Sequence, residues 1–373
     1  MGDERPIAFF VPSLRGGGAE RAMLDLARGF ASRGVKVDLV LAQAEGPYVS
    51  MVPATIRVVD LRAKRILASL WPLVKYLRSV RPRALLATHT HANLAALWAK
   101  RLARVPTRIV IRQATTGSHP IYRVGSPFRF HFFHRLARYC YPWAEGIVAV
   151  SEGVAEDMCR HLGLKEDRID VIYNAVFLDE IEKLAQQPIP HPWLQTPDLP
   201  VILSAGRLSS EKDFPTLLRA FERVLRKVPS RLMILGEGKE RAALSSLVRQ
   251  LEIEKSVDMP GFVGNPFAYM ARSAVYVLSS VCEGMPNALV QAALLGVPIV
   301  STDCPSGPRE IVREGGGGYL VQVGNDMELA SAILKVLGGE GKALGRENLL
   351  SVFSDGAVLK AYGEILFKGE AHA

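Results

Sequence analysis

Residues 281–312 read VCEGMPNALVQAALLGVPIVSTDCPSGPREIV, the most informative stretch of this chain. A glutamate in a turn, Glu283, precedes an apolar helix that we expect over residues 288–295. A Gly-Val-Pro break follows, then a short apolar strand over residues 299–302 and a Gly/Pro turn. A strand end, a polar turn and a helix N-terminus in this order can hold an anion or a hydroxyl-rich ligand.

This run resembles the donor-sugar motif of the retaining nucleotide-sugar glycosyltransferases of family 4, which share the two-Rossmann GT-B fold. Glu283 stands at the first Glu of the family's E-x7-E motif, whereas the second position is Gln291. The resemblance implies that Glu283 contacts the donor sugar. It also implies that the residues after Glu283 bind sugar and phosphate, largely through backbone amides: Gly284, Met285, Pro286 and Asn287.

Gln291 departs from the family pattern, in which a carboxylate accepts two ribose hydroxyls. Its amide can still reach those hydroxyls, but it brings no charge. Hydrogen bonds to charged acceptors contribute about 1.5–3 kcal/mol, against about 0.5–1.5 kcal/mol for neutral ones. We therefore expect weaker ribose binding. The alternative is that Gln291 is an ordinary helix residue on an apolar segment.

Length and composition predict a globular protein of two domains. The 373 residues suffice for two cores, and no apolar run among them approaches the ~18 residues that span a bilayer. Residues 1–6 lead directly into a strand-like run, without a secretory signal. Four scattered cysteines suggest a reducing compartment. We therefore expect a cytoplasmic protein, or one attached to the inner face of a membrane only at its surface.

The positive charge is concentrated in the first half of the chain. Residues 1–188 hold 27 Lys and Arg against 17 Asp and Glu, whereas residues 189–373 hold 19 against 20. No acidic residue occurs between Asp60 and Glu145, although sixteen Lys and Arg do. Such a field attracts acidic partners: anionic lipid, phosphorylated substrate or nucleic acid.

Strands and helices alternate along the chain, which predicts doubly wound parallel sheets. In the first half we expect strands at residues 7–11, 35–42, 84–88, 107–112, 146–151 and 169–173. The alternation restarts after residue 200, with strands expected at residues 201–206, 231–235, 257–259, 275–279 and 299–302.

Five prolines lie between residues 188 and 200, which predicts a semi-rigid linker over residues 181–200. It would join an N-terminal acceptor-binding Rossmann-like domain, residues 1–180, to a nucleotide-sugar-binding one, residues 201–355. Two such domains imply a cleft between them for a bridging ligand. The resemblance implies that a last helix, within residues 356–373, crosses back to the first domain.

Residues 204–218, SAGRLSSEKDFPTLL, place Arg207 and Lys212 in a loop after a strand. Two cations five residues apart at a strand end can reach one diphosphate together, Arg as a planar fork and Lys as a point charge. Family 4 has the same G-R-x4-K pattern, and its Arg and Lys neutralise the leaving nucleoside diphosphate. The resemblance therefore gives Arg207 and Lys212 that catalytic role, with Glu283. Taken alone, the pair would read as solvated loop cations.

Glycine turns end three further strands. The resemblance places the nucleotide base near Gly236 and near the backbone of Phe262 and Val263, although each turn alone could be structural. It also places the loop of Gly17 and Gly18 near the distal donor phosphate and the acceptor. The run GGGAER, residues 16–21, does not match the strict dinucleotide fingerprint. The resemblance implies a UDP-linked N-acetylhexosamine donor, because this run is common in family members that use such donors.

No D-x-D, H-E-x-x-H or His/Cys cluster is present, so we expect transfer without a metal or other cofactor. Many family members place a His near the donor sugar after the strand that here ends at Arg112. The strict position holds Arg112 or Gln113, and His119 is the nearest substitute. A plain loop residue is the alternative for His119.

Two segments of the acid-free region combine apolar or aromatic side chains with cations, residues 73–83 and residues 128–143. Such mixtures favour the headgroup region of anionic leaflets. An ordinary helix packed on the sheet is the alternative for the first segment.

Together these observations predict a retaining hexosyltransferase. It would move a hexose or N-acetylhexosamine from a nucleotide sugar, UDP-linked by preference, to a lipid-linked or polysaccharide acceptor. A sugar-nucleotide epimerase is the closest alternative. An NAD-dependent oxidoreductase and a nucleic-acid binder are further ones, although no RNA-binding module is evident.

Overall fold

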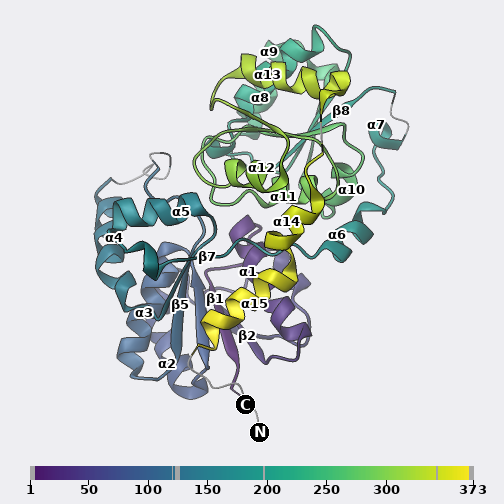
Figure 1. Ribbon diagram of the computed structural model, residues 1–373. Helices are drawn as coiled ribbons and strands as arrows, with labels where there is room; N and C mark the ends of the chain where they lie inside the picture. The colour runs from purple at the N-terminus through teal and green to yellow at the C-terminus, as the bar shows by residue number, and fades with distance from the viewer. Residues whose placement is uncertain (1–4, 120, 122–126, 196–197, 342, 369–373) are drawn as a thin grey trace. The chain divides into compact units, whose positions relative to one another are not determined.

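The computed structural model describes residues 5–119, 121, 127–195, 198–341 and 343–368 (Figure 1). The chain divides into two compact units. Unit 1 consists of Met1–Ala175 together with Asp355–Ala373, and unit 2 of Val176–Ser354.

Unit 1 is built on a seven-stranded parallel sheet with the order β3-β2-β1-β4-β5-β6-β7. Its central strands are fully buried, so they read as continuous apolar runs, as in other sheets covered on both faces. The strands are β1 (Ile7–Val11), β2 (Val37–Leu41), β3 (Arg57–Asp60), β4 (Ala84–Thr88), β5 (Arg108–Gln113), β6 (Gly146–Ala149) and β7 (Asp170–Val171).

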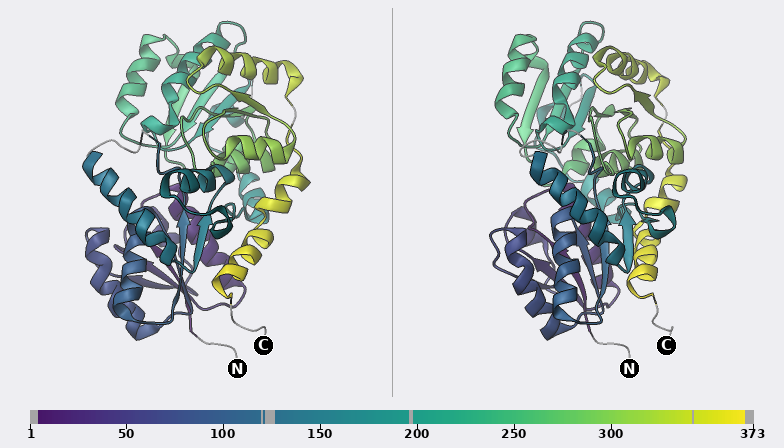
Figure 2. Two further views of the ribbon diagram at one scale, coloured as in Figure 1. Left: turned by 60° about the vertical axis from the view of Figure 1, so that its left-hand side comes forward. Right: turned by 90° about the vertical axis from the view of Figure 1, so that its left-hand side faces the viewer.

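Helices cover this sheet, with α1 packed beside α15 and α3 packed between α2 and α4 (Figures 1 and 2). Their bounds are α1 (Gly18–Ser32), α2 (Leu70–Val80), α3 (Thr90–Ala103), α4 (Pro127–Cys140), α5 (Glu152–Asp157) and α15 (Asp355–Leu366).

Helix α15 returns to unit 1, as the resemblance predicted. Arg108 Nε donates to the carbonyl of Ile365 at 2.7 Å, and the phenol of Tyr362 is fully buried. Burial raises the pKa of that phenol, while the charge of Arg112 acts in the opposite direction.

Arg112, the second-last residue of β5, is fully buried. Its guanidinium donates to Tyr362 Oη (3.2 Å), to Thr88 Oγ1 (3.1 Å) and to Asn174 Oδ1. A buried charge is tolerated only when it is well hydrogen-bonded, so these neutral oxygens stabilise it in place of a carboxylate. The last helix therefore completes the polar centre of unit 1.

Unit 2 is built on a six-stranded parallel sheet with the order β10-β9-β8-β11-β12-β13. Its strands are β8 (Val201–Ala205), β9 (Arg231–Leu235), β10 (Val257–Gly261), β11 (Val275–Leu278), β12 (Ile299–Thr302) and β13 (Tyr319–Val321). Its later helices are α8 (Phe214–Leu225), α9 (Arg241–Gln250), α10 (Pro266–Met270), α11 (Asn287–Leu294), α12 (Pro308–Gly315), α13 (Asp326–Lys335) and α14 (Arg346–Phe353). The doubly wound α/β prediction is confirmed for both halves.

The segment predicted as a linker, residues 181–200, is instead packed within unit 2. It carries most of α6 (Leu178–Ala185) and a short helix, α7 (Pro192–Gln195), while Thr196 and Pro197 lie outside the described residues. The side chains of Ile181, Ile189 and Leu194 are buried. Asn265 Nδ2 donates to the carbonyl of Leu184 at 2.8 Å. The prediction took the prolines as the sign of a linker, but Pro192 is the first residue of a helix.

Within the described part of the chain, no helix combines the length and the apolar character needed to cross a membrane.

Candidate active site

The candidate site of unit 2 lies where the strand order of its sheet reverses. Strands β8 and β11 are neighbours although two strands separate them along the chain, so the chain winds outward from them in opposite directions. Arg207 and Lys212 follow β8, and Glu283 follows β11. The crevice beyond the carboxyl ends of such strands is where open α/β sheets bind ligands.

Lys212 and Glu283 form an ion pair across this reversal. Lys212 Nζ lies 2.6 Å from Glu283 Oε1, and the two side chains are only 20% and 11% exposed. Ser280 Oγ donates to the same carboxylate oxygen at 2.6 Å. The structure thus brings together two of the three predicted catalytic residues and fixes the carboxylate from two sides. Ser280 was not predicted.

The loops that carry these residues are joined by hydrogen bonds to the backbone. Ser279 Oγ donates to the carbonyl of Lys212 at 2.7 Å, and the amide of Val281 donates to the carbonyl of Glu211 at 2.9 Å. Thr302 Oγ1, at the end of β12, donates to the carbonyl of Ser280 at 2.6 Å. Three neighbouring strand ends therefore hold the pair in a fixed geometry.

A thiol lies close to the pair. Burial raises the pKa of Cys304, and the negative charge of Glu283 raises it further. Cys304 is therefore a neutral, buried thiol at neutral pH and contributes no nucleophile to the site.

Arg207 lies earlier in the same loop, and its side chain is exposed. The loop ends at Asp213, whose backbone is left-handed (φ 43°), and Thr216 Oγ1 donates to Asp213 Oδ2 at 2.7 Å. Burial raises the pKa of the Asp213 carboxyl, while its hydrogen bonds with Thr216 act against this. Asp213 therefore fixes the start of α8 through its bond to Thr216. Arg207, six residues earlier, lies at the exposed surface of the loop.

Gly236, at the end of β9, is required by the packing of the backbone. Its φ is +135°, and a Cβ there would lie 2.0 Å from the carbonyl oxygen of Gly206. Its amide donates to the carbonyl of Gly261, at the end of β10, at 2.8 Å. Phe262 and Val263 follow, and Phe262 is 57% exposed. The predicted base-binding residues thus occupy adjacent strand ends, on the other side of β8 from Glu283.

Helix α11 starts directly after the Glu283 turn. Gly284, Met285 and Pro286 are buried, and Asn287 is the first helical residue. The N-cap residue, Pro286, supplies no side-chain cap, and this end carries the positive pole of the helix dipole. Gln291 lies one turn further along, on the same side of the helix as Asn287.

A second turn supports this helix start. Gly307 has φ +92°, and a Cβ there would lie 2.4 Å from Pro286 Cδ. The buried carboxylate of Glu310 accepts the amide of Gly307 at 3.2 Å. The sequence predicts this turn but not its contact with Pro286, because that contact depends on the register of β11 against β12.

The other predicted site residues belong to unit 1. The amides of Gly16 and Gly17 donate to Glu20 Oε2 at 2.9 and 2.8 Å, and Gly18 is the first residue of α1. The Glu20 carboxylate therefore accepts two of the backbone amides that were predicted to lie near the donor phosphate. His119 Nδ1 accepts the amide of Ile121 at 3.3 Å. Ligand contacts of Gly17, Gly18 and His119 stay predictions.

Solved structures share the fold of this chain. Anabaena HepE in complex with UDP and glucose superposes with a TM-score of 0.79 at 21% identity, covering 98% of this chain and all of that one. Sucrose-phosphate synthase from Thermosynechococcus elongatus gives 0.81 at 18% identity, covering 97% and 98%. Two parallel α/β units with a returning last helix define the GT-B fold.

Two family models match most of the chain. Residues 16–180 match the model "Glycosyltransferase Family 4", and residues 186–347 match "Glycosyl transferases group 1". The chain belongs to the family 4-type glycosyltransferases.

Curated relatives agree with this assignment. The chain is 32% identical over 245 residues to the Campylobacter jejuni N-acetylgalactosamine-N,N'-diacetylbacillosaminyl-diphospho-undecaprenol 4-alpha-N-acetylgalactosaminyltransferase. That match covers 66% of this chain but only 64% of the relative, just under two thirds of its length. The lipopolysaccharide core biosynthesis glycosyltransferase LpsE of Rhizobium meliloti is 29% identical, over 94% of this chain and 96% of LpsE.

Proposed function

We propose that the protein transfers a hexose or N-acetylhexosamine from a UDP-sugar to a lipid-linked or polysaccharide acceptor, with retention at the anomeric carbon. One observation carries the proposal: a lysine–glutamate pair fixed at the strand-order reversal, with Arg207 exposed on the same loop. This arrangement offers positive charge for a diphosphate beside a carboxylate for sugar hydroxyls.

The chemistry follows from these groups. The bond between the anomeric carbon and the diphosphate oxygen breaks, and the positive charges of Arg207 and Lys212 stabilise the charge that develops on that oxygen. The acceptor hydroxyl attacks the same face of the sugar, and its proton passes to the departing diphosphate. Glu283 orients the ring through its hydroxyls. The positive end of α11 favours the diphosphate, so no metal is required.

The identity of the donor is supported by relatives of the same fold. HepE is described in complex with UDP, with UDP-glucose and with UDP and glucose. In our proposal the base lies beside Gly236, Phe262 and Val263, and the ribose beside Gln291.

The nature of the acceptor is supported by the names of relatives. The Campylobacter enzyme is named for a diphospho-undecaprenol substrate, and others for lipopolysaccharide core and amylovoran biosynthesis. We therefore place this protein in cell-envelope polysaccharide synthesis, on the cytoplasmic side of the membrane and in peripheral contact with it.

Thermal unfolding tests the choice of donor. UDP at about 100 times its Kd adds about 2.7 kcal/mol to the free energy of unfolding, which raises Tm by about 5 °C or more for a unit of this size. ADP, GDP and NAD(H) should give smaller shifts. A larger shift with NAD(H), or isomerisation of a UDP-sugar without an acceptor, would favour an oxidoreductase or an epimerase instead.

Gln291→Glu should tighten UDP binding about ten-fold, because a charged acceptor for the ribose hydroxyls replaces a neutral one. Isothermal titration of UDP measures the change. Gln250→Glu, an exposed position at the end of α9, is the matched control for the added charge. An equal effect of both variants, or weaker binding by Gln291→Glu, would remove Gln291 from the ribose site.

A further inference from the structure

Aromatic side chains gather around the half-buried Trp143, between α3 and α4 of unit 1. The ring of Trp143 lies edge-to-face against Trp98 and against Tyr139, each with centroids 5.2 Å apart. The guanidinium of Arg101 stacks 3.7 Å above the Trp143 ring. Trp98 and Tyr139 are 38% and 68% exposed. Amphipathic rings of this kind settle at the boundary between lipid headgroups and acyl chains.

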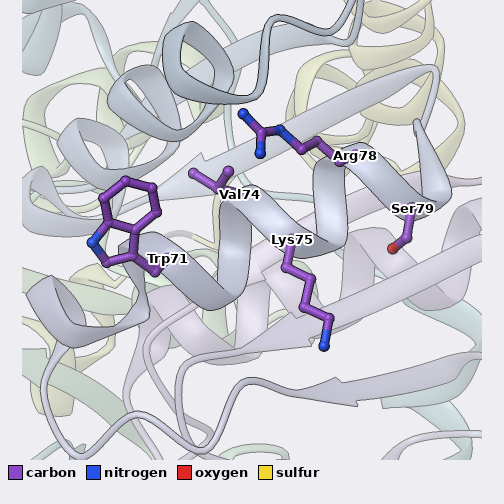
Figure 3. Close-up of a pocket in the computed structure, with 5 residues that line it drawn as sticks. All are labelled: Trp71, Val74, Lys75, Arg78 and Ser79. Atoms are coloured by element: carbon purple, nitrogen blue, oxygen red, sulfur yellow. The ribbon is translucent and has the colours of Figure 1, made fainter.

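A second exposed group lies on the neighbouring helix, α2. Trp71 is 68% exposed and lines a shallow pocket of about 370 Å³ with Val74, Lys75, Arg78 and Ser79 (Figure 3). Arg78 also donates to the carbonyl of Leu102 at 2.8 Å, in the last turn of α3. The pocket and the aromatic cluster therefore belong to one packed set of helices (Figures 1 and 2). We call the aromatic and cationic side chains at the surface of this set the α2–α4 face. Its main members are the exposed Trp71, Lys75, Trp98, Arg101 and Tyr139, together with the half-buried Trp143.

The charge of this face has one sign. Residues 61–144, which include α2, α3 and α4, contain sixteen Lys and Arg and no acidic residue. The next acidic residue along the chain, Glu145, pairs with Lys100 and accepts the amide of Ile109. The face also holds three of the four tryptophans, because only Trp193 lies in unit 2.

Two polyanions could suit such a field, a nucleic acid or an anionic bilayer. Single-stranded nucleic acids need open aromatic platforms on which bases stack. Trp98 and Tyr139 pack edge-to-face against Trp143, and Arg101 covers the Trp143 ring, so this cluster offers no open platform. Trp71 is exposed, but it is a single indole beside Lys75 and Arg78, and such a mixture of indoles and cations matches a bilayer surface better.

We propose that the α2–α4 face docks the protein on an anionic bilayer, with the tryptophans in the headgroup region and the cations on lipid phosphates. This deepens the proposed function, on which it rests for the lipid-linked acceptor. It identifies the residues that bring the enzyme to the surface in which such an acceptor is dissolved.

Tryptophan fluorescence tests the docking directly. In a Trp193→Phe background every remaining tryptophan belongs to the α2–α4 face. Vesicles of phosphatidylcholine with phosphatidylglycerol should shift the emission to shorter wavelength, and vesicles of phosphatidylcholine alone should not. Raising the salt from about 0.1 M to 1 M shortens the Debye length from about 10 to 3 Å and should release most of the protein.

Charge variants give the matched comparison. Arg135 is a further exposed cation of this face, on α4. Each cation near an anionic leaflet contributes about a five-fold gain in partitioning, so Lys75→Gln with Arg135→Gln should lower vesicle binding about 25-fold. Lys227→Gln with Lys255→Gln removes the same charge from exposed positions of unit 2 and should change binding little. Equal losses in both pairs, or no binding to anionic vesicles, would overturn the proposal.

Two further measurements separate the alternatives. Single-stranded RNA that binds as tightly as the vesicles, with the same sensitivity to Lys75→Gln and Arg135→Gln, would assign the face to nucleic acid and overturn membrane docking. The thermal shift by UDP should be unchanged in all these variants. A variant that no longer binds vesicles should therefore still bind UDP. If UDP does not raise Tm, the vesicle-binding experiment still tests membrane docking independently.

Discussion

Lys212→Ala should lower kcat/KM for sugar transfer by about 10²–10³-fold or more, because it removes a fixed positive charge from the place where the diphosphate gains charge. The same change removes the ion-pair partner of the Glu283 carboxylate, which is 11% exposed and still accepts the hydroxyl of Ser280. Removing the partner of a mostly buried charge costs about 1–3 kcal/mol, so Tm should also fall while unfolding stays cooperative. Steady-state kinetics and differential scanning calorimetry measure the two effects.

A double variant distinguishes catalysis from a purely structural role of Lys212. Lys212→Ala with Glu283→Ala removes both charges and should recover part of the lost Tm, but not the activity. Lys255→Ala, an exposed lysine elsewhere in unit 2, serves as the control and should behave like the unmodified protein. Turnover within a few-fold of the unmodified protein in Lys212→Ala would take Lys212 out of the reaction.

Gly236→Ala should destabilise unit 2 by about 3 kcal/mol or more, since the new Cβ would lie 2.0 Å from the carbonyl oxygen of Gly206 and φ is +135°. The obstacle is backbone, so it cannot rotate away as a side chain would. Relief requires the end of β9 to move away from β8, which would displace the loop that carries Arg207 and Lys212. Urea unfolding and UDP titration should therefore both report a loss.

Gly264→Ala is the matched control for that substitution. Gly264 follows the neighbouring strand, β10, and a Cβ there meets no atom within 4 Å. Its effect on the free energy of unfolding should stay within about 0.5 kcal/mol. If Gly236→Ala is equally mild, the tight packing between the ends of β8 and β9 is not needed for stability.

The fold was largely predictable because buried parallel strands leave long apolar runs that stand out in the sequence. The two strands that the sequence analysis missed, β3 and β13, are edge strands with only one neighbour each. Strand β3 is mostly exposed, so its residues, RVVD, carry no continuous apolar signal. The linker was predicted wrongly because its prolines outweighed buried residues such as Ile181 and Leu194.

The candidate site was only partly predictable. Arg207, Lys212 and Glu283 were chosen by resemblance, but the contact between Lys212 and Glu283 joins residues 71 positions apart and depends on β8 lying beside β11. Supporting residues such as Ser280 and Thr302 carry no local signal, since serine and threonine are common near strand ends. The amides of Gly16 and Gly17 donate to the Glu20 carboxylate. A glycine-rich sequence predicts a loop with available amides, but it does not show that a nearby carboxylate accepts them.

The return of α15 has a consequence for how the protein is made. On the ribosome, Arg112 is synthesised some 250 residues before Tyr362, its partner in the finished protein. Until then the Arg112 guanidinium in the nascent first half lacks its Tyr362 acceptor, although Thr88 and Asn174 are already present. The apolar surface that Val358 and Leu359 later cover is also exposed. Unit 2 is one continuous stretch of chain, so we expect it to complete its folding before unit 1 does. Unit 1 is synthesised first, but it can complete its folding only after the last segment has left the ribosome.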